Sequence, residues 1–285
     1  MNKLLTILCL VLLSVHSYSQ EVVTGHILIK DGIYYHQDTN QLVTGIVEEF
    51  YDDGQLLSRK NYKDGEQDGL WESFDENGKL KFRGNYIDGE LDGLSEGFHE
   101  NGQLNFRQHY KNGKEDGLSE VFFDNGQLWI RVNFIDGKED GLSEGFHENG
   151  QLRIRGNYKD GKRDGLWEQF HENGQLFRRV NFIDGKEDGP FEEFHEDGQL
   201  FGRGNYVNGV QDGPVEWFYE NGQLKIRGNY KDGEHDGLWE WFYENGQLEE
   251  RGNLKDGKRD GLFEYFDEEG NLTETVTYEN GELVE

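Results

Sequence analysis

The sequence contains very little cysteine and proline, and few basic residues for its acidity. Its 285 residues include one cysteine, two prolines, and 29 Lys and Arg against 58 Asp and Glu. A single thiol excludes a disulfide framework and a thiolate zinc site. The net charge of −29 repels nucleic-acid phosphate and anionic lipid headgroups. We therefore expect no nucleic acid and no lipid as partner, and the charge favours a basic one.

Residues 1–19 have the pattern of a secretory signal peptide. Lys3 precedes an apolar run from Leu4 to Leu13, and Ser17 and Ser19 are the small residues of a cleavage site. The run is too short to span a bilayer, and no cysteine follows the site to carry a lipid. We expect a secreted, periplasmic or cell-surface protein without a lipid anchor. Cleavage would also remove Cys9, the only cysteine.

The remaining chain is dominated by a 24-residue repeat. With its glycine as position 1, position 4 is always Glu, position 6 always Phe and position 12 always Leu, while positions 10 and 21 are always Gly. A fixed period of this length indicates a repeat architecture. The first glycines of the ten units are Gly45, Gly69, Gly93, Gly117, Gly141, Gly165, Gly189, Gly213, Gly237 and Gly261.

Each unit carries two turn signals, which predict a β-hairpin. The glycine at position 21 always follows Asp or Asn, and the glycine at position 10 follows Asn, Asp or, once, Glu269. Such pairs adopt positive φ at low cost and mark hairpin turns. We therefore predict an all-β fold: an elongated single antiparallel sheet of about ten stacked hairpins. The expected divisions are a signal peptide (1–19), a capping β segment (20–44) and the repeats (45–285).

Two registers fit the turn at position 10. A two-residue turn pairs position 4 with position 15, for example Glu48 with Arg59. A three-residue loop with a glycine bulge pairs position 6 with position 12. We favour the second register, because it gathers the apolar positions 2, 6, 12 and 18 on one face. It leaves the Glu column on that face without a partner.

The invariant Phe and Leu columns are the expected structural core of the repeat. They comprise Phe50, Phe74, Phe98, Phe122, Phe146, Phe170, Phe194, Phe218, Phe242 and Phe266 together with Leu56, Leu80, Leu104, Leu128, Leu152, Leu176, Leu200, Leu224, Leu248 and Leu272.

The expected binding surface is an aromatic group in units eight and nine. It consists of Trp217, Tyr219, Trp239, Trp241 and Tyr243, at positions 3, 5 and 7. Alternation along a strand turns these positions to one side. Trp and Tyr dominate binding hot spots, whereas ordinary sheet packing also enriches aromatics. Both interpretations stay open.

The sequence contains no pattern that predicts a catalytic or metal site. Four histidines share position 7: His99, His147, His171 and His195. Equivalent positions in adjacent hairpins lie two strands, or about 9.5 Å, apart at about 4.8 Å per strand, which is too far to share a zinc. The acidic loops lack the spacing of an EF-hand. A repeating single sheet gives its carboxylates nearly equal environments, unlike a glycosidase pair. We expect no enzyme, no cofactor and no metal.

Segments such as Arg155–Trp167 and Glu244–Leu248 resemble MORN-repeat variants, in particular those of the bacterial YwqK-type antitoxins. The segment Gly32–Gly45 is similar to the N-terminal part of those proteins. The likeness covers about residues 24–285 and implies the hairpin-array fold. It implies no catalytic residue. Classical MORN repeats are associated with membrane and protein scaffolding.

The leading functional hypothesis is a secreted or surface-associated scaffold that binds another protein. One alternative is a carbohydrate-binding module, whose Trp and Tyr row would stack on sugar rings. Another is an antitoxin-like or immunity protein that masks a toxin.

Overall fold

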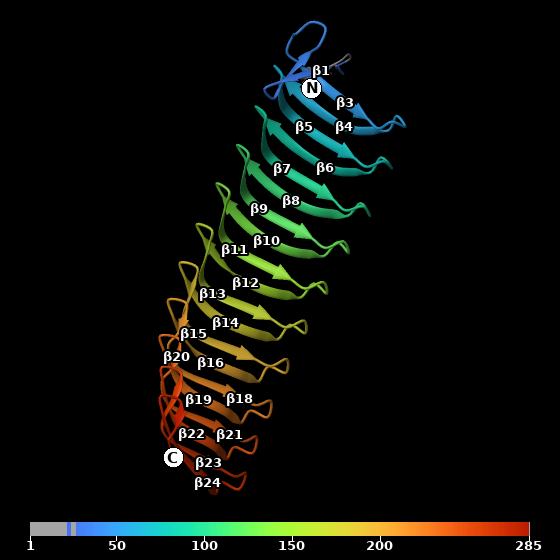
Figure 1. Ribbon diagram of the computed structural model, residues 1–285. Helices are drawn as coiled ribbons and strands as arrows, with labels where there is room; N and C mark the ends of the chain where they lie inside the picture. The colour runs from blue at the N-terminus through green and yellow to red at the C-terminus, as the bar shows by residue number, and fades with distance from the viewer. Residues whose placement is uncertain (1–21, 24–26, 285) are drawn as a thin grey trace, which may run out of the picture.

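The chain folds into one long row of β-hairpins (Figure 1). The computed structural model describes residues 22–23 and 27–284, and the predicted signal peptide lies outside them. The described residues form strands and turns without a helix, and thus none that could cross a membrane. The predicted all-β, single-sheet hairpin array is confirmed.

A small separate hairpin lies at the N-terminal end of the row. Strands β1 (Ile27–Lys30) and β2 (Ile33–His36) pair antiparallel. The following segment reaches the main sheet, where Gly65 donates its backbone N–H to the carbonyl of Val43 at 2.8 Å. Val43 is fully buried with Val47 and Tyr62. This segment, within predicted residues 20–44, therefore packs on the first repeat hairpin.

The main sheet pairs its strands in chain order. Ten hairpins, numbered one to ten, each span one repeat, and two-residue strands appear where a strand is interrupted. The strands are β3 (Gly45–Phe50), β4 (Leu56–Lys63), β5 (Glu66–Phe74), β6 (Leu80–Ile87), β7 (Glu90–Phe98), β8 (Leu104–Lys111), β9 (Lys114–Phe122), β10 (Leu128–Ile135), β11 (Lys138–Phe146), β12 (Leu152–Lys159), β13 (Lys162–Phe170), β14 (Leu176–Ile183), β15 (Lys186–Phe194), β16 (Leu200–Val207), β17 (Val210–Gln211), β18 (Gly213–Phe218), β19 (Leu224–Lys231), β20 (Glu234–His235), β21 (Gly237–Phe242), β22 (Leu248–Lys255), β23 (Lys258–Phe266), β24 (Leu272–Glu279) and β25 (Glu282–Leu283).

The two turns of each repeat differ in length. Between hairpins, Asp64 and Gly65 form a two-residue turn with φ of 51° and 84°, and Lys63 pairs with Glu66 across it. Positive φ at both residues is the geometry that Asp-Gly favours. Within each hairpin, the position 7 N–H donates to the position 11 carbonyl, as Tyr51 does to Gln55 at 2.9 Å. Three residues ending in Gly54 therefore form the loop.

Both registers considered from the sequence occur in the same hairpin. Phe50 pairs with Leu56, and Glu48 pairs with Arg59, because a β-bulge at position 13 shifts the pairing between them. The favoured pairing of position 6 with position 12 is confirmed. The expectation that the Glu column lacks a partner is wrong, because the bulge places position 15 opposite position 4.

The bulge also redistributes the side chains between the two faces. One face, the ladder face, carries positions 2, 4, 6, 12, 15 and 17. The other, the aromatic face, carries positions 3, 5, 14, 16 and 18. Position 18 was expected with positions 2, 6 and 12 but lies opposite them, because a one-residue shift exchanges the faces of a strand.

The hydrophobic core lies on the aromatic face rather than in the invariant Phe and Leu columns. Its buried members are Trp167, Val180, Phe182, Phe191, Val215, Trp239, Leu254 and Phe263. None of the position 6 Phe or position 12 Leu residues is fully buried; Phe50 and Leu272 are 56% and 53% exposed, and the others are half-buried. The expected core assignment is therefore corrected. The invariant columns lie beside the hairpin loops, because the position 6 Phe ends one strand and the position 12 Leu begins the next.

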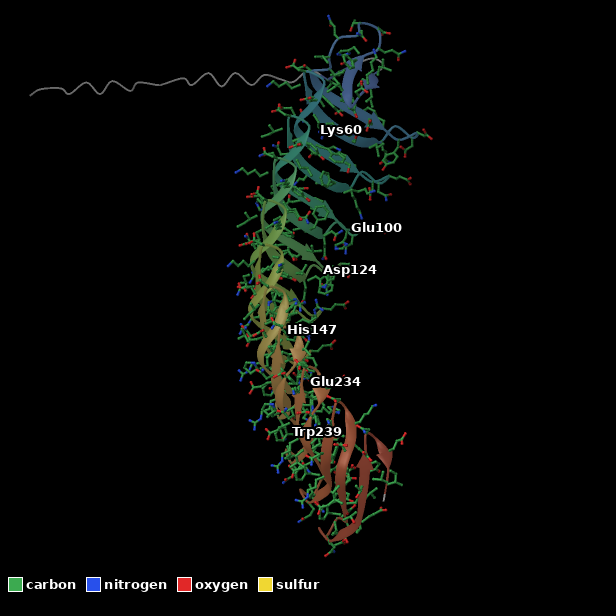
Figure 2. All side chains as sticks on the ribbon, turned by 60° about the vertical axis from the view of Figure 1, so that its left-hand side comes forward. Lys60, Glu100, Asp124, His147, Glu234 and Trp239 are labelled. Carbon is green, nitrogen blue, oxygen red and sulfur yellow. The ribbon has the colours of Figure 1, made fainter. Side chains whose placement is uncertain are left out.

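The array as a whole is elongated and coiled. Its two ends lie far apart, and the row of strands winds as it proceeds (Figures 1 and 2). The right-handed twist of successive strands accumulates in this way in a long single sheet.

Candidate binding surface

An alternating ladder of Glu and Arg side chains runs along the ladder face. The position 15 Arg of one hairpin reaches the position 4 Glu of the next. Arg155 Nε donates to Glu168 Oε2 at 2.6 Å, and Arg203 Nη2 lies 2.5 Å from Glu216 Oε2. Pairs of this kind join hairpins two and three and every later neighbouring pair except three and four, where the separation is 3.7 Å. The ladder therefore couples successive repeats.

Glu96 is the most enclosed carboxylate of the ladder. Its side chain is 5% exposed and contacts both Arg83 and Arg107. Burial alone would raise the pKa of Glu96, but the hydrogen bonds from Arg83 and Arg107 lower it below its ordinary value. The carboxylate is therefore held charged at neutral pH.

The invariant position 6 Phe supports the same coupling. The Arg155 guanidinium lies 5.7 Å from the ring centroid of Phe170, and that of Arg227 lies 5.5 Å from Phe242. A guanidinium over an aromatic face is a cation–π contact. The Phe column thus positions the arginines of the preceding hairpin.

A column of exposed leucines runs beside the ladder. Position 2 is 51% exposed at Leu166 and Leu238 and 52% at Leu262, and its leucines in hairpins two to five are 41–50% exposed. Ile46 of hairpin one is half-buried. Pro190 and Pro214 take its place in hairpins seven and eight and are also exposed. Exposed apolar patches on protein surfaces commonly mark interaction sites, which makes this column a candidate binding surface.

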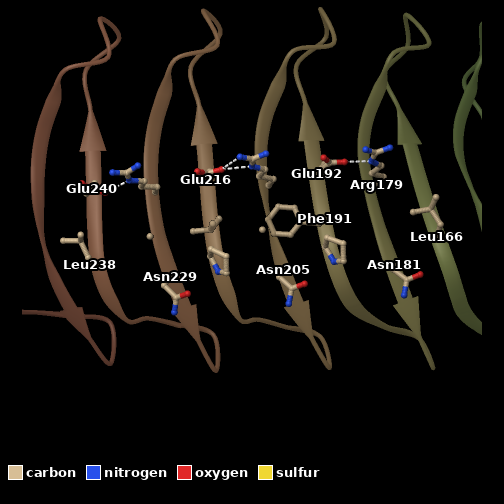
Figure 3. Close-up of a pocket in the computed structure, with 17 residues that line it drawn as sticks. Leu166, Arg179, Asn181, Phe191, Glu192, Asn205, Glu216, Asn229, Leu238 and Glu240 are labelled. Carbon is tan, nitrogen blue, oxygen red and sulfur yellow. Dashed lines mark hydrogen bonds and ion pairs between the residues drawn. The ribbon is translucent and has the colours of Figure 1, made fainter.

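Hairpins six to nine form a groove of about 1030 Å³ on this face. Leu166, Pro190, Pro214 and Leu238 line it. In Figure 3, Leu166 and Leu238 lie between the Glu–Arg ladder on one side and the Asn column of position 17 on the other. The groove arginines are about half exposed, 47% at Arg179, whereas the glutamates are more enclosed. The groove therefore offers apolar side chains flanked by guanidinium and amide donors.

The five aromatic residues predicted as a binding surface lie outside this groove. Trp239 is 3% exposed and belongs to the core, and Trp217 and Trp241 pack against that core as partly buried residues. The expectation that they form an open aromatic patch is wrong for Trp239, because neighbouring side chains of the aromatic face pack around it.

Tyr219 and Tyr243 have a different environment. The Tyr219 hydroxyl donates to the carbonyl of Phe242 at 2.7 Å, and that of Tyr243 donates to Phe266 at 2.8 Å. Burial, with nearby Glu249 and Glu244, raises the pKa of Tyr219. Both hydroxyls join neighbouring hairpins, and a role in binding a partner stays a prediction for them.

Three of the four position 7 histidines make the same contact, and His195 is the exception. His147 Nε2 lies 3.0 Å from the carbonyl of Phe170, and His171 Nε2 lies 3.0 Å from that of Phe194. Tyr and His are interchangeable here because each can donate one hydrogen bond to the next hairpin. Within residues 22–23 and 27–284 no group of three or more His, Cys, Asp or Glu side chains is arranged to hold a metal.

The sequence analysis did not identify the groove residues, because position 2 is apolar in every repeat. A position that is apolar in every repeat was expected to be structural, together with positions 6 and 12. The available signal was proline: Pro190 and Pro214 are the only prolines of the chain, and both lie in the groove.

The repeat geometry agrees with a comparison against protein families. The family described as MORN repeat variant matches ten segments that cover most of the chain: residues 43–64, 67–88, 91–112, 115–136, 139–160, 163–184, 187–208, 211–232, 236–256 and 259–280. The chain belongs to the MORN repeat variant family. Its members are built from this repeat, and the chain is accordingly a repeat scaffold. The finer likeness to the YwqK-type antitoxins stays a prediction.

Other comparisons add little to this assignment. No curated protein matches the chain. Among solved structures, it is similar to a chain of the TcdB2–TccC3 crystal structure, with 12% identity over 82% of this chain and a TM-score of 0.20. It is also similar to the Photorhabdus luminescens Tc holotoxin pore with the mutation TccC3-D651A, with 12% identity over 88% of this chain and a TM-score of 0.19. The chain spans only 14–15% of those chains, and scores this low do not establish a shared fold.

Proposed function

We propose that this MORN-repeat protein is a secreted or surface-associated scaffold that binds a protein partner in the groove of hairpins six to nine. The observation that carries the proposal is the exposed Leu and Pro column in that groove. Exposure of apolar side chains to water costs free energy that a partner would recover by covering them. The signal-like residues 1–19 support export.

The charge pattern favours a partner that is basic outside its contact patch. The chain carries a net charge of −29, which steers basic proteins toward it at low salt. Within the groove the ion pairs are internal, because each exposed guanidinium is already paired with a glutamate of the next hairpin. The apolar column therefore provides the contact, and the acidic exterior accelerates encounter.

The proposal is tested by a photo-crosslinking amino acid placed at position 2. A benzophenone side chain at Leu238, inside the groove, should crosslink one discrete protein in the source cells. The same group at Leu70, an equivalent exposed position outside the groove, should not.

Binding of the purified crosslinked partner then measures the contribution of the column. Leu238→Glu should weaken it by roughly tenfold or more, since one lost apolar contact is worth about 1–3 kcal/mol. Leu70→Glu should leave it unchanged. Equal crosslinking at both positions, or none, contradicts a binding site in the groove.

A further inference from the structure

Two hollows with the same construction lie at the loop edge of the sheet, away from the groove. The first notch, of about 560 Å³, involves hairpins four to six, and the second, of about 490 Å³, involves hairpins seven to nine. Both are lined by the same eight repeat positions, displaced by 72 residues. The recurrence of one set of positions in two places indicates a built feature of the array.

Each notch has one aromatic wall from position 13. Trp129 forms it in the first notch and is 45% exposed; its ring lies 6.0 Å from that of Phe123. Phe201 forms it in the second notch, 4.9 Å from the ring of His195. The position 13 bulge removes these rings from the ladder pairing and leaves them at the sheet margin.

The opposite wall carries a cation, again at position 13 of the following hairpin. Arg153 occupies it in the first notch and Lys225 in the second. The Lys225 ammonium lies 5.2 Å from the ring centroid of Tyr219. An aromatic residue followed one repeat later by a cation at position 13 occurs only at these two places in the sequence.

Carboxylates and an amide complete each notch. Glu148 and Glu172 line the first and Glu220 and Glu244 the second, all exposed and all without a salt bridge among the described residues. The amides of Asn149 and Asn221 are fixed, because each donates to a carbonyl of the next hairpin at 2.8 Å. The polar groups therefore include both donors and acceptors.

The charges of each notch select against an anion, because two carboxylates outnumber the single arginine or lysine in a chain of net charge −29. A neutral ligand rich in hydroxyl groups can engage every polar group of the notch. Hydroxyls donate to carboxylates and accept from guanidinium, ammonium and amide groups, whereas a cation would leave the arginine or lysine without a partner. Its C–H face can pack on the exposed aromatic ring.

We propose that the two notches are equivalent binding sites for a neutral carbohydrate, distinct from the protein-binding groove. Three hairpins separate them, which places them about 29 Å apart at roughly 4.8 Å per strand. A polysaccharide chain long enough to span this distance engages both notches. Two linked weak sites then bind far more tightly than one.

The experiment is native affinity electrophoresis of the whole protein in gels that contain soluble neutral polysaccharides: a β-glucan, a xylan, a galactomannan, a galactan and starch. At least one should retard the protein. Trp129→Ala should weaken that retardation several-fold, and Trp129→Ala with Phe201→Ala should abolish it.

The matched control is Phe177→Ala. Phe177 is a position 13 aromatic residue, 38% exposed, that lines neither notch; its loss should leave retardation unchanged. Leu238→Glu should also leave it unchanged, which separates failure here from failure of the groove. Circular dichroism checks that each variant is folded.

Three results overturn the proposal. The first is no retardation by any of the five polysaccharides. The second is retardation that survives in the folded double variant. The third is binding of oligolysine, without binding of a polysaccharide, that the double variant loses. The last result would assign the notches to cationic side chains of a protein.

Discussion

Glycine and large aromatic residues have complementary places on the aromatic face. Trp239 packs on Gly228 of the preceding hairpin, where a Cβ atom would lie 2.2 Å from the indole ring, and Trp167 packs on Gly156 in the same way. The absence of a side chain at position 16 thus creates the space that the aromatic residue of position 3 fills. At these two boundaries the tryptophan therefore depends on the glycine of the preceding repeat.

Substitution at this contact should be strongly non-additive. Trp239→Ala should lower the free energy of unfolding by about 3–5 kcal/mol through lost burial and a cavity. Gly228→Ala should lower it by about 1–3 kcal/mol through overpacking. The double variant should be less destabilised than the sum, because the alanine at 228 then has room. Urea unfolding of the four proteins measures this; additivity within about 0.5 kcal/mol would contradict the contact.

Two half-buried carboxylates on the aromatic face should make stability depend on pH. Burial, and secondarily the charge of Glu139, raises the pKa of Glu115, and burial raises the pKa of Glu139. A carboxyl whose pKa is higher in the folded state stabilises the fold below its unfolded pKa, and this contribution is lost as pH rises through the folded pKa.

Glu115→Gln should therefore raise the melting temperature at pH 7, and the gain should shrink as the pH is lowered toward 4. Glu148→Gln, at an exposed turn, is the control and should change melting little at either pH. A gain for Glu115→Gln that is the same at pH 4 and pH 7 would show that its charge is not the cause.

Neighbouring hairpins are joined by a small set of contacts that recur at most boundaries. The Arg at position 15 reaches the next Glu and Phe, and the Tyr or His at position 7 reaches the next position 6 carbonyl. Since these contacts involve only neighbours, stability should be close to a sum of hairpin and interface terms.

Deletion of one complete repeat should therefore leave a folded array. Without residues 165–188, Arg155 meets Glu192 and Phe194 in place of Glu168 and Phe170, and Gly156 faces Phe191. The variant should retain the strand signal per residue in circular dichroism. Deletion of only residues 165–176 removes one strand. The strands that follow would then run in the opposite direction and present the wrong face to their neighbours, so this variant should unfold or aggregate. Similar behaviour of the two deletions would contradict nearest-neighbour coupling.

The hairpins could be predicted from the sequence, but the assignment of their faces could not. The 24-residue period and the Asp-Gly and Asn-Gly pairs determine where strands begin and end. The bulge at position 13 is occupied by residues as different as Leu57, Lys81 and Trp129, so it has no compositional mark. A one-residue shift exchanges the faces, and core and exposed columns were therefore reversed. The groove and the notches depend on that shift.

The complete molecule is a coiled rod, and its dimensions follow from the number of strands. Twenty strands at about 4.8 Å extend about 95 Å, and a rod of that length has a radius of gyration of about 27 Å or more. A compact protein of this length would have about 19 Å. Small-angle scattering should give the larger value; a value near 19 Å would mean that the array folds back on itself.

The leucine column has a consequence for how a partner chooses its place. The leucines at position 2 are 41–52% exposed, so a partner that recognised leucine alone could bind at several of them with almost equal energy. Seven equivalent leucines would contribute about 1.1 kcal/mol of favourable entropy but no defined position. Pro190 and Pro214 interrupt the column in two adjacent hairpins. They distinguish one register from the others, so the rod can hold a partner at a fixed distance from its ends.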